Sequence, residues 1–295
     1  MDAAVGIVAD SACSLGAELA AKHDVRLVPM QVAFGGRIVP ESDVSQFEVA
    51  DRLGSGLSTS APSPGAFAEA IEEADRGAGV VVLTVSSKLS ASYAAASLAA
   101  GLTGVDTKVV DTLTAAGAEG LVVLAACRAA QEGRSAAATA ERAQRAAHGA
   151  RLVAVVDSLE HLARGGRVPQ AANWAGAHLG LQAMFELSGG RIRLLRPVRG
   201  AARADEALVA RVERSDPRDG SQLHVAGMHG FDEGGAVRLI EALERSCSPV
   251  STFVGSFGPV MLAHIGPGMR GLAWLWDRSE EGVEQGAGDS AQLST

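Results

Sequence analysis

The most constraining feature of the sequence is Val80–Ala96, where an apolar run meets a hydroxyl-rich turn and then an alanine-rich stretch. Val80–Val85 is short enough for a buried strand, and Ala91–Ala100 is rich in a strong helix former. A strand that ends in a polar turn before a helix is typical of open α/β sheets, which bind ligands at the carboxyl ends of their strands. The free N–H groups and hydroxyls of this turn predict an anion site, whereas Ser90 alone is equally typical of an N-cap.

Two further groups of polar residues flank predicted elements earlier in the chain. Ser58–Pro64 carries four hydroxyl side chains and two prolines, which hold the segment extended before the next helix. Asp10 and Ser11 directly follow the apolar run Val5–Ala9, so they too lie at the end of a predicted strand. An acid in that position either belongs to a ligand site or only binds loop backbone, and the sequence leaves both interpretations open.

The order of the apolar runs predicts the fold class. Strand and helix patterns alternate through residues 1–150, which predicts an α/β fold with a mostly parallel sheet. In residues 151–278 the segment Ser188-Gly189-Gly190 separates two strand patterns, a hairpin signal that predicts a mixed sheet. A helix is predicted for Gln170–Leu179, and the polar, glycine-rich residues 279–295 are predicted to be a disordered tail. We therefore expect a two-domain α/β protein.

Three local patterns carry more specific expectations. Val25–Phe34 is predicted as a strand that Pro29 interrupts. Ser14 is predicted to cap the helix Leu15–Lys22, because serine is favoured at that position. His264 is expected in a glycine–proline turn, where the residues alone favour a structural role over a binding role.

Composition excludes several classes of protein. The formal net charge is −8, whereas nucleic-acid binding requires a basic face and anionic lipid attracts a polybasic segment. No run of about 18 apolar residues predicts a membrane span, so a cytoplasmic protein is expected. The cysteines, Cys13, Cys127 and Cys247, lie far apart and form neither a disulfide framework nor a metal-ligand spacing. Neither a metal nor a cofactor is predicted.

The chain lacks the common catalytic and nucleotide-binding motifs. It contains no Gly-Lys pair, no G-x-G-x-x-G after a strand and no G-x-S-x-G. Donor-rich loops without such motifs favour a receptor for an anion over an enzyme. One alternative is a stand-alone esterase or phosphatase with Ser90 or Cys13 as nucleophile and His264 as base. Another is a lipid-sensing regulator.

Several short stretches occur in an order that resembles the DegV family, the fatty-acid-binding subunits of bacterial fatty acid kinase. The resemblance covers residues 4–277, and each stretch is weak alone. Together they make a specific signal: Asp10-Ser11, Thr59-Ser60-Ala61-Pro62, Ser86-Ser87-Lys88-Leu89-Ser90, Gly165-Gly166-Arg167, Arg199 in PVRG, and His264-Ile265-Gly266-Pro267-Gly268.

The resemblance implies a lipid-binding protein without a nucleotide site of its own. Such a protein holds one long-chain fatty acid, such as palmitate, and presents its carboxylate to a separate ATP-dependent kinase that resembles dihydroxyacetone kinases. The resulting acyl phosphate enters phospholipid synthesis.

Carried over by residue, the resemblance implies that Thr59 and Ser90 hydrogen-bond the carboxylate. His264 and Arg199 would orient the head group or neutralise its charge, and Arg167 would face the kinase. Buried carboxylates need several donors, which these side chains supply. Neighbouring polar side chains are secondary candidates for the same site: Ser60, Ser92, Asp10 and Ser11.

The chain departs from the family pattern at three places. Ala91 stands where the family usually has glycine, Ile265 where it has threonine, and Ala183-Met184 where it has Lys-Pro. A methyl group at Ala91 disfavours a positive φ, and Ile265 removes a polar group beside His264. These changes bear on the identity of the ligand, and a divergent relative that binds another lipid-like acid is the alternative.

Overall fold

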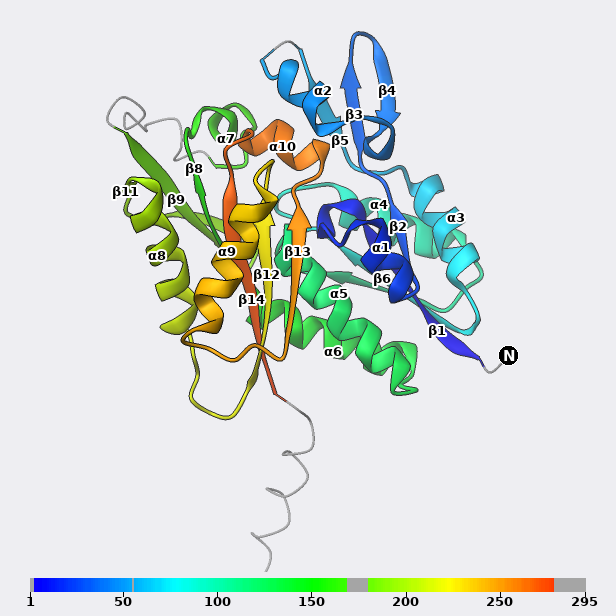
Figure 1. The fold of residues 1–295 in the computed structure, drawn as a ribbon. Helices are drawn as coiled ribbons and strands as arrows, with labels where there is room; N and C mark the ends of the chain where they lie inside the picture. Colours follow the sequence, from blue (N-terminus) through cyan, green and yellow to red (C-terminus); the bar gives the residue numbers. More distant parts are fainter. Residues whose placement is uncertain (1–2, 55, 169–179, 279–295) are drawn as a thin grey trace, which may run out of the picture.

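The computed structural model describes residues 3–54, 56–168 and 180–278 and arranges them as two main sheets with helices between and around them (Figure 1). The helix predicted for Gln170–Leu179 and the tail predicted for residues 279–295 lie outside the described residues.

The first sheet is parallel and has the strand order β2-β1-β6-β7. Its strands are β1 (Ala4–Asp10), β2 (Val25–Val28), β6 (Gly77–Thr84) and β7 (Thr107–Asp111). The chain passes from β1 outward to β2 and later returns to place β6 on the other side of β1. The carboxyl ends of β1 and β6 are therefore a topological switch point, which is where open α/β sheets bind ligands.

Helices cover both faces of this sheet, because alternate side chains of β1 and β6 point in opposite directions. Val8 and its neighbours pack under α3 (Pro64–Ala74) and α4 (Ser92–Leu102). The opposite face packs against α5 (Ala116–Gln131) and α6 (Ala136–Gly149). The predicted parallel sheet with two covered faces is confirmed.

A small antiparallel sheet, with the order β4-β3-β5, stands beside the first one. It consists of β3 (Gln31–Phe34), β4 (Arg37–Pro40) and β5 (Ser58–Ser60), and α2 (Gln46–Asp51) precedes β5. The sequence predicted β5 only as an extended segment, because three polar residues carry no strand periodicity.

Two local predictions are wrong in part. Val25–Phe34 forms two strands in different sheets, since the chain turns at Pro29, which cannot donate a ladder hydrogen bond. Ser14 does not cap the following helix, α1 (Gly16–Lys22); it adopts a φ of 54° in the left-handed region, and its buried hydroxyl has no hydrogen-bond partner among the described residues.

The second sheet is mixed, as predicted, with the order β10-β9-β8-β14-β12-β13 and β11 paired to β9. Only β12 and β13 pair in parallel within the described part of this sheet. Gly189 and Gly190 form the predicted hairpin turn between two of its strands. The strands are β8 (Arg151–Val156), β9 (Leu181–Ser188), β10 (Arg191–Leu194), β11 (Val198–Arg199), β12 (Gln222–His229), β13 (Ser251–Ser256) and β14 (Arg270–Asp277).

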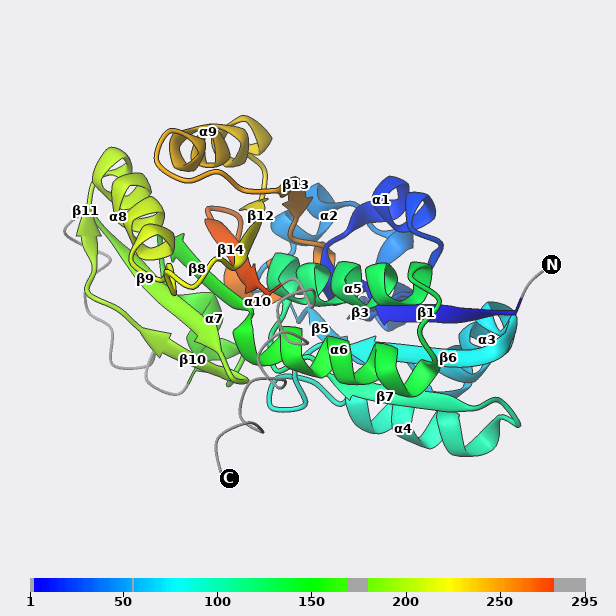
Figure 2. The ribbon, with the colours of Figure 1, turned by 90° about the horizontal axis from the view of Figure 1, so that it is seen from below.

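The second sheet also has helices on both faces. One face is covered by α8 (Ala201–Glu213) and α9 (Glu233–Glu244). The other packs on α5 and α6, so these two helices lie between the two main sheets and share one core with both (Figure 2). The domain boundary near residue 150 remains a prediction. Residues 3–150 and 151–278 are called the N-terminal and C-terminal halves below.

Two short helices complete the part that positions the site: α7 (Glu160–Arg164) and α10 (Pro259–Ile265). Glu41, in a 3-10 turn of the N-terminal half, is buried and accepts a hydrogen bond from the Val260 N–H at 3.0 Å. This bond attaches the start of α10 to the other half. His264 consequently lies in the last turn of a helix, and its expected place in a glycine–proline turn is wrong. The helix ends at Ile265, and Gly266 follows as its C-cap.

Candidate functional site

A cavity of about 290 Å³ lies at the contact between the two halves. This volume is close to the lower end of the range of about 300–1,000 Å³ typical of small-molecule pockets. Its lining is mostly apolar and comes from both halves, including Met30, Leu152, Phe185, Ile192, Met261 and Met269. Such a lining favours a ligand with a hydrocarbon part.

Polar side chains at the cavity come from separate parts of the chain. Thr59 lies on β5, Ser90 in the turn after β6, Arg167 after α7 and His264 on α10, and all four line the cavity together with Ser60. The structure therefore brings together five residues that the sequence singled out. We call Thr59, Ser90, Arg167 and His264 the polar wall.

Thr59 and His264 form the centre of the polar wall. Their side chains are hydrogen-bonded, with 2.7 Å between Thr59 Oγ1 and His264 Nε2, although 205 positions separate them in the sequence. Burial, and to a lesser degree the positive charge of Arg167, lowers the pKa of His264 to about 4. The ring is neutral at pH 7, and its bond to Thr59 fixes both side chains at the cavity.

Ser90 combines a cavity position with a local backbone role. Its hydroxyl oxygen accepts a hydrogen bond from the Ser92 N–H at 3.2 Å and lies 3.1 Å from the Ser92 hydroxyl. The N-cap position of α4 belongs to Ala91, which makes no side-chain cap. Ser90 thus satisfies a first-turn N–H of α4 and also faces the cavity. Ala91 has a φ of −81°, so the glycine usual in the family is not needed for this backbone conformation.

Arg167 supplies a positive charge at the polar wall. Its guanidinium donates to the carbonyl oxygens of Gly165, at 2.6 Å, and Leu89, at 3.4 Å. It has no carboxylate partner within the part of the chain that the structure describes. The charge is therefore held in place by two carbonyls and remains available to an anion.

A second cavity, of about 390 Å³, shares part of its lining with the first. Thr59, Arg167 and His264 line both cavities, and the second is also lined by His161 and Arg164. Three residues of the polar wall thus lie where the apolar cavity meets a second cavity that has further basic side chains. An acid bound in the apolar cavity can place its anionic group between the two.

The other predicted site residues do not reach the apolar cavity. Arg199 pairs with Leu181 at the edge of the second sheet, is exposed, and does not line either cavity, so the structure does not bring it together with Thr59, Ser90 and His264. The Ser11 hydroxyl donates to Glu41 and accepts from the Met30 N–H at 2.9 Å, so this secondary candidate holds a loop instead.

Asp10 and Ser92 lie behind the polar wall and are fully buried. The Asp10 carboxylate accepts hydrogen bonds from the N–H groups of Ala12, at 3.2 Å, and Val85, at 3.1 Å. It therefore ties the ends of β1 and β6 together, which is the backbone role that the sequence left open. Next to it lies Glu119, which sequence reasoning missed although it is the only acid in the otherwise apolar first half of α5.

The three departures from the family pattern have ordinary places in the fold. Ile265 is buried and adds an apolar surface to the cavity beside His264. Ala183 and Met184 are buried in β9 as regular members of the sheet. None of these residues blocks the polar wall.

The arrangement that a hydrolase with Ser90 or Cys13 as nucleophile needs, with His264 as its base, is absent from the described residues. His264 is bonded to Thr59 and makes no hydrogen bond with Ser90. The Cys13 thiol is fully buried, and desolvation raises its pKa well above the ordinary value. A thiol in that environment is a poor nucleophile, because the thiolate is the reactive form.

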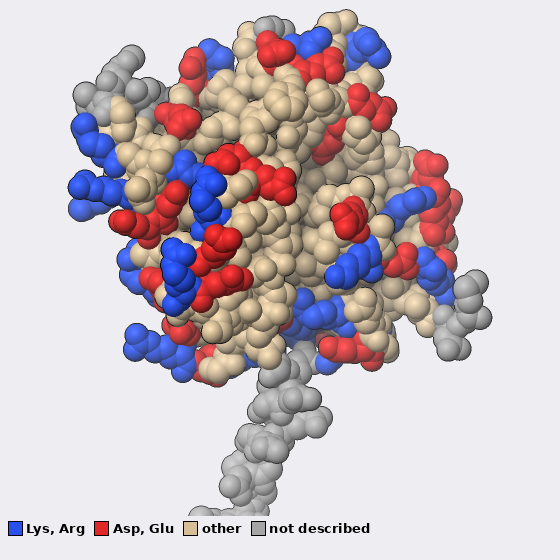
Figure 3. All heavy atoms as spheres, in the orientation of Figure 1, with Lys and Arg blue, Asp and Glu red and all other residues tan. Residues whose placement is uncertain are grey.

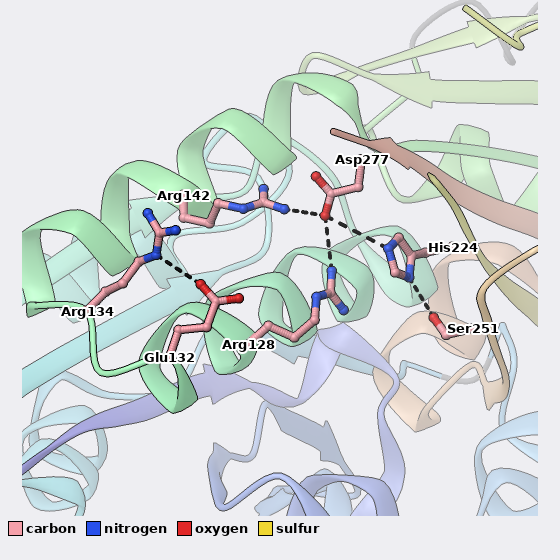
Figure 4. Close-up of polar contacts among 7 residues, drawn as sticks. All are labelled: Arg128, Glu132, Arg134, Arg142, His224, Ser251 and Asp277. Atoms are coloured by element: carbon pink, nitrogen blue, oxygen red, sulfur yellow. Dashed lines mark hydrogen bonds and ion pairs between the residues drawn. The ribbon is translucent and has the colours of Figure 1, made fainter. Parts of the chain in front are cut away.

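A different histidine lies near a serine and an aspartate, at the opposite part of the contact between the halves (Figure 4). His224 Nδ1 is 2.6 Å from Ser251 Oγ, and Nε2 is 3.9 Å from Asp277 Oδ2. Asp277 accepts hydrogen bonds from Arg128 on α5, at 3.2 Å, and from Arg142 on α6. We call these five residues the clasp, because they join α5 and α6 to the end of β14; they do not line either cavity.

Surface charge does not indicate a polyanion. On the face shown in Figure 3, basic and acidic side chains lie among one another, especially over α8 and α9. Ion pairs such as Arg238–Asp232 and Arg270–Asp205 neutralise several of the basic side chains there.

The described residues contain neither a group suited to a metal ion nor a helix suited to span a membrane. No group of three or more histidine, cysteine or acidic side chains could hold a metal ion there. No helix among those residues has the length and apolar character that crossing a membrane requires.

Comparison with known families and proteins agrees with the fold. The family model described as "Uncharacterised protein, DegV family" matches residues 4–277. A DegV domain-containing protein of Streptomyces coelicolor is 34% identical over 276 residues, which are 91% of this chain and 97% of that protein. A protein of Thermotoga maritima named "Fatty acid-binding protein" is 31% identical over 279 residues, with 91% and 96% of the two chains covered.

Solved structures give the same result. A DegV lipid-binding protein from Thermotoga maritima superposes with a TM-score of 0.82 at 29% identity and covers 94% of this chain and 100% of its own. A DegV family protein from Thermus thermophilus, described by its fatty acid binding, also has a TM-score of 0.82 at 29% identity, with 92% and 99% covered. The predicted two-sheet α/β architecture is confirmed.

Proposed function

The chain belongs to the DegV family, and on that premise we propose that it binds one long-chain fatty acid, such as palmitate, in the apolar cavity. The carboxylate lies at the polar wall, where Thr59 and Ser90 donate hydrogen bonds and His264 orients the group. The observation that carries this proposal is the single polar side of an otherwise apolar cavity.

The hydrocarbon chain and the carboxylate of such a ligand gain binding free energy from different parts of the cavity, the apolar lining and the polar wall. Each buried CH2 group contributes about 0.8 kcal/mol, so a long chain supplies most of the affinity. A carboxylate at the polar wall would be costly to desolvate without donors, and two hydroxyls with a nearby guanidinium offset that cost. The charge of Arg167 lies on the same wall, in a position to attract the anion.

We also propose that the protein presents the carboxylate to a partner and has no catalytic activity alone. The resemblance implies a separate cytoplasmic, ATP-dependent fatty acid kinase similar to dihydroxyacetone kinases. Phosphoryl transfer requires access to the carboxylate in line with the leaving group and neutralisation of the charge that gathers. In this proposal the kinase reaches the head group through the second cavity, which shares Arg167 with the apolar cavity, and Arg167 faces the kinase.

Organic extraction of the purified recombinant protein, followed by mass spectrometry, tests the proposal. We expect a long-chain fatty acid in the extract, or saturable binding when palmitate is added to delipidated protein. Absence of both would refute fatty acid binding. Hydrolysis of simple ester or phosphate substrates that is lost in Ser90→Ala would instead support the hydrolase alternative.

A further inference from the structure

Two buried carboxyl groups lie directly behind the polar wall, and the proposed function does not use them. Asp10 ends β1, and Glu119 is in the first turn of α5, which runs along this sheet (Figure 2). Both side chains are 0% exposed. Neither has a basic ion-pair partner in the ranges that the structure describes.

Close packing of α5 accounts for the position of Glu119. Gly117 lies two residues before Glu119, and Gly120 directly follows it. Both glycines pack against neighbouring strands and turns. A Cβ on Gly117 would come within 2.4 Å of the Met228 sulfur, and a Cβ on Gly120 within 2.7 Å of the Cys13 carbonyl oxygen. The first turns of α5 therefore lie close against β12 and against the 3-10 turn that follows β1, and Glu119 between these glycines is 0% exposed.

Two adjacent buried carboxyl groups without a cation cannot both be ionised at low cost. Desolvation raises the pKa of Asp10 to about 6, while desolvation and the negative charge of Asp10 raise that of Glu119 well above its ordinary value. The favoured arrangement at neutral pH is a protonated Glu119 that donates its proton to the Asp10 carboxylate. Neither oxygen of Glu119 accepts a hydrogen bond from a donor among the described residues.

Asp10 connects this pair to the polar wall. Its carboxylate lies beside the side chain of Ser92, which is itself fully buried. The Ser92 hydroxyl oxygen lies 3.1 Å from that of Ser90, which faces the cavity. A continuous series of polar contacts thus runs from Glu119 through Asp10 and Ser92 to Ser90.

We propose that Glu119 and Asp10 form a proton-sharing pair that positions the Ser92–Ser90 hydroxyls, so that the Ser90 hydroxyl is directed at the ligand's carboxylate. Glu119 is a positioning residue, because it acts through Asp10 and does not line the cavity. The inference rests on the proposed fatty acid binding, and it adds a second layer of residues that determine affinity.

The test compares palmitate affinity in wild type, Glu119→Leu, Glu119→Gln and Ser90→Ala by equilibrium titration. Glu119→Leu removes the donor to Asp10 and is expected to weaken binding by about tenfold, the cost of a misdirected hydrogen bond at a charged acceptor. Glu119→Gln keeps the shape and offers an amide N–H to Asp10, so its affinity is expected within about twofold of wild type. In a Ser90→Ala background, Glu119→Leu should have no further effect, because the residue through which it acts is gone.

Thr139→Val is the matched control. Thr139 is also fully buried in a helix of the shared core, and its hydroxyl has no partner among the described residues, but it lies on α6 away from the polar wall. Its substitution should leave palmitate affinity unchanged. An equal loss in Thr139→Val and Glu119→Leu would show a general effect of core changes and overturn the inference.

Other outcomes separate this inference from the proposed function. If wild type does not bind palmitate, the proposed function fails. If wild type binds and Ser90→Ala is weakened, but Glu119→Leu binds as tightly as wild type or adds its full effect in the double variant, only the positioning role fails. Should Glu119→Leu not fold, Ser92→Ala interrupts the same series of contacts, and unchanged affinity in that variant would equally overturn the inference.

Discussion

The clasp and the polar wall both join the two halves of the molecule. Each contains a histidine, buried in the clasp and half-buried at the polar wall, whose pKa desolvation lowers to about 4. In the clasp, His224 is bonded to Ser251, and Asp277 receives two guanidinium groups (Figure 4). At the polar wall, His264 is bonded to Thr59, while the guanidinium of Arg167 has only carbonyl partners among the described residues, and a cavity lies alongside.

This difference distinguishes a structural polar cluster from a binding one. In the clasp, opposite charges satisfy one another and line neither of the two cavities, so the energy of the cluster goes into holding α5 and α6 against β14. At the polar wall, donors and a positive charge face a space that a ligand can fill. The perturbed pKa of a histidine is common to both and therefore does not identify the site by itself.

The largest effect expected from this comparison is on stability, at the clasp. Asp277→Ala leaves the guanidiniums of Arg128 and Arg142 without their shared carboxylate, and Arg142 is only 14% exposed. Breaking a buried ion pair on one side costs about 3–5 kcal/mol, so the free energy of unfolding should fall by that amount in denaturant titrations. Without denaturant, the palmitate affinity of Asp277→Ala should stay within about twofold of that of wild type.

A control for the clasp lies in the connection between α5 and α6. Glu132→Ala breaks the exposed pair with Arg134, and Glu132 is 58% exposed, so a loss below about 1 kcal/mol is expected. Equal losses in Glu132→Ala and Asp277→Ala would contradict the structural role given to the clasp.

The next effect is on affinity, at the polar wall. Thr59→Ala or Ser90→Ala should each weaken palmitate binding by about 1–3 kcal/mol, because a buried acceptor loses a donor. The loss should be smaller for the methyl ester of palmitate, which carries no charge. Titration calorimetry measures both ligands.

Ser63→Ala serves as the comparison for these two hydroxyl substitutions. Ser63 caps α3 by accepting a hydrogen bond from the Ala66 N–H at 3.1 Å, and it does not line the cavity. It should lower stability by about 1 kcal/mol and leave affinity unchanged. If Thr59→Ala or Ser90→Ala behaves in the same way, the hydroxyl concerned is only structural.

A third prediction separates the two histidines by NMR titration. Without ligand, both rings should stay neutral down to about pH 5, since burial lowers both pKa values to about 4. Palmitate places a carboxylate beside His264 and should raise its pKa by at least about one unit, because a nearby negative charge favours the protonated ring. The pKa of His224 should not move. A shift at His224 alone would place the ligand at the wrong cluster.

The sign of the stability change follows from the same lowered values. A histidine with a folded pKa of about 4 takes up a proton more readily in the unfolded chain, whose ordinary value is 6.5. Asp10 contributes in the opposite direction, because its folded pKa is raised from 3.8 to about 6. The contribution of the two histidines to stability should be lost as pH falls from about 6.5 through 4. Bound palmitate should reduce the share of this loss that comes from His264, which thermal denaturation at a series of pH values can measure.

Among the residues of the polar wall, the smallest effect on fatty acid affinity is expected at Arg167. Its side chain is exposed and lines both cavities, so Arg167→Ala should change palmitate affinity by no more than about threefold while lowering acyl-phosphate formation by a reconstituted kinase. Arg199→Ala, at an exposed edge strand away from both cavities, is the control and should change neither. Equal turnover of Arg167→Ala and wild type at sub-saturating protein would remove the docking role.

The sequence predicted the parts of this comparison that depend on local pattern. Val80–Val85 predicts a buried strand, because six apolar or β-branched residues precede a polar turn. The structure has β6 at this place. The resemblance to a family then placed Thr59, Ser90 and His264 at one site. The contact between Thr59 and His264 itself spans 205 positions, a separation over which periodicity carries no information.

What the sequence could not predict depends on tertiary partners. Ser11 has the residue type of a ligand donor, but its hydroxyl is taken by Glu41, and Arg199 lies at a sheet edge that only strand pairing defines. The importance of Glu119 appears only when α5 packs against β1 beside Asp10. The clasp likewise needs two helices and the last strand to meet around Asp277.

A crystal structure of the protein with palmitate tests the central claim most directly. We expect the carboxylate within hydrogen-bond distance of Thr59 Oγ1 and Ser90 Oγ, and the hydrocarbon chain among the apolar side chains that include Phe185 and Met269. The clasp should be unchanged. A ligand bound with its carboxylate away from the polar wall, or bound outside the apolar cavity, would contradict the account.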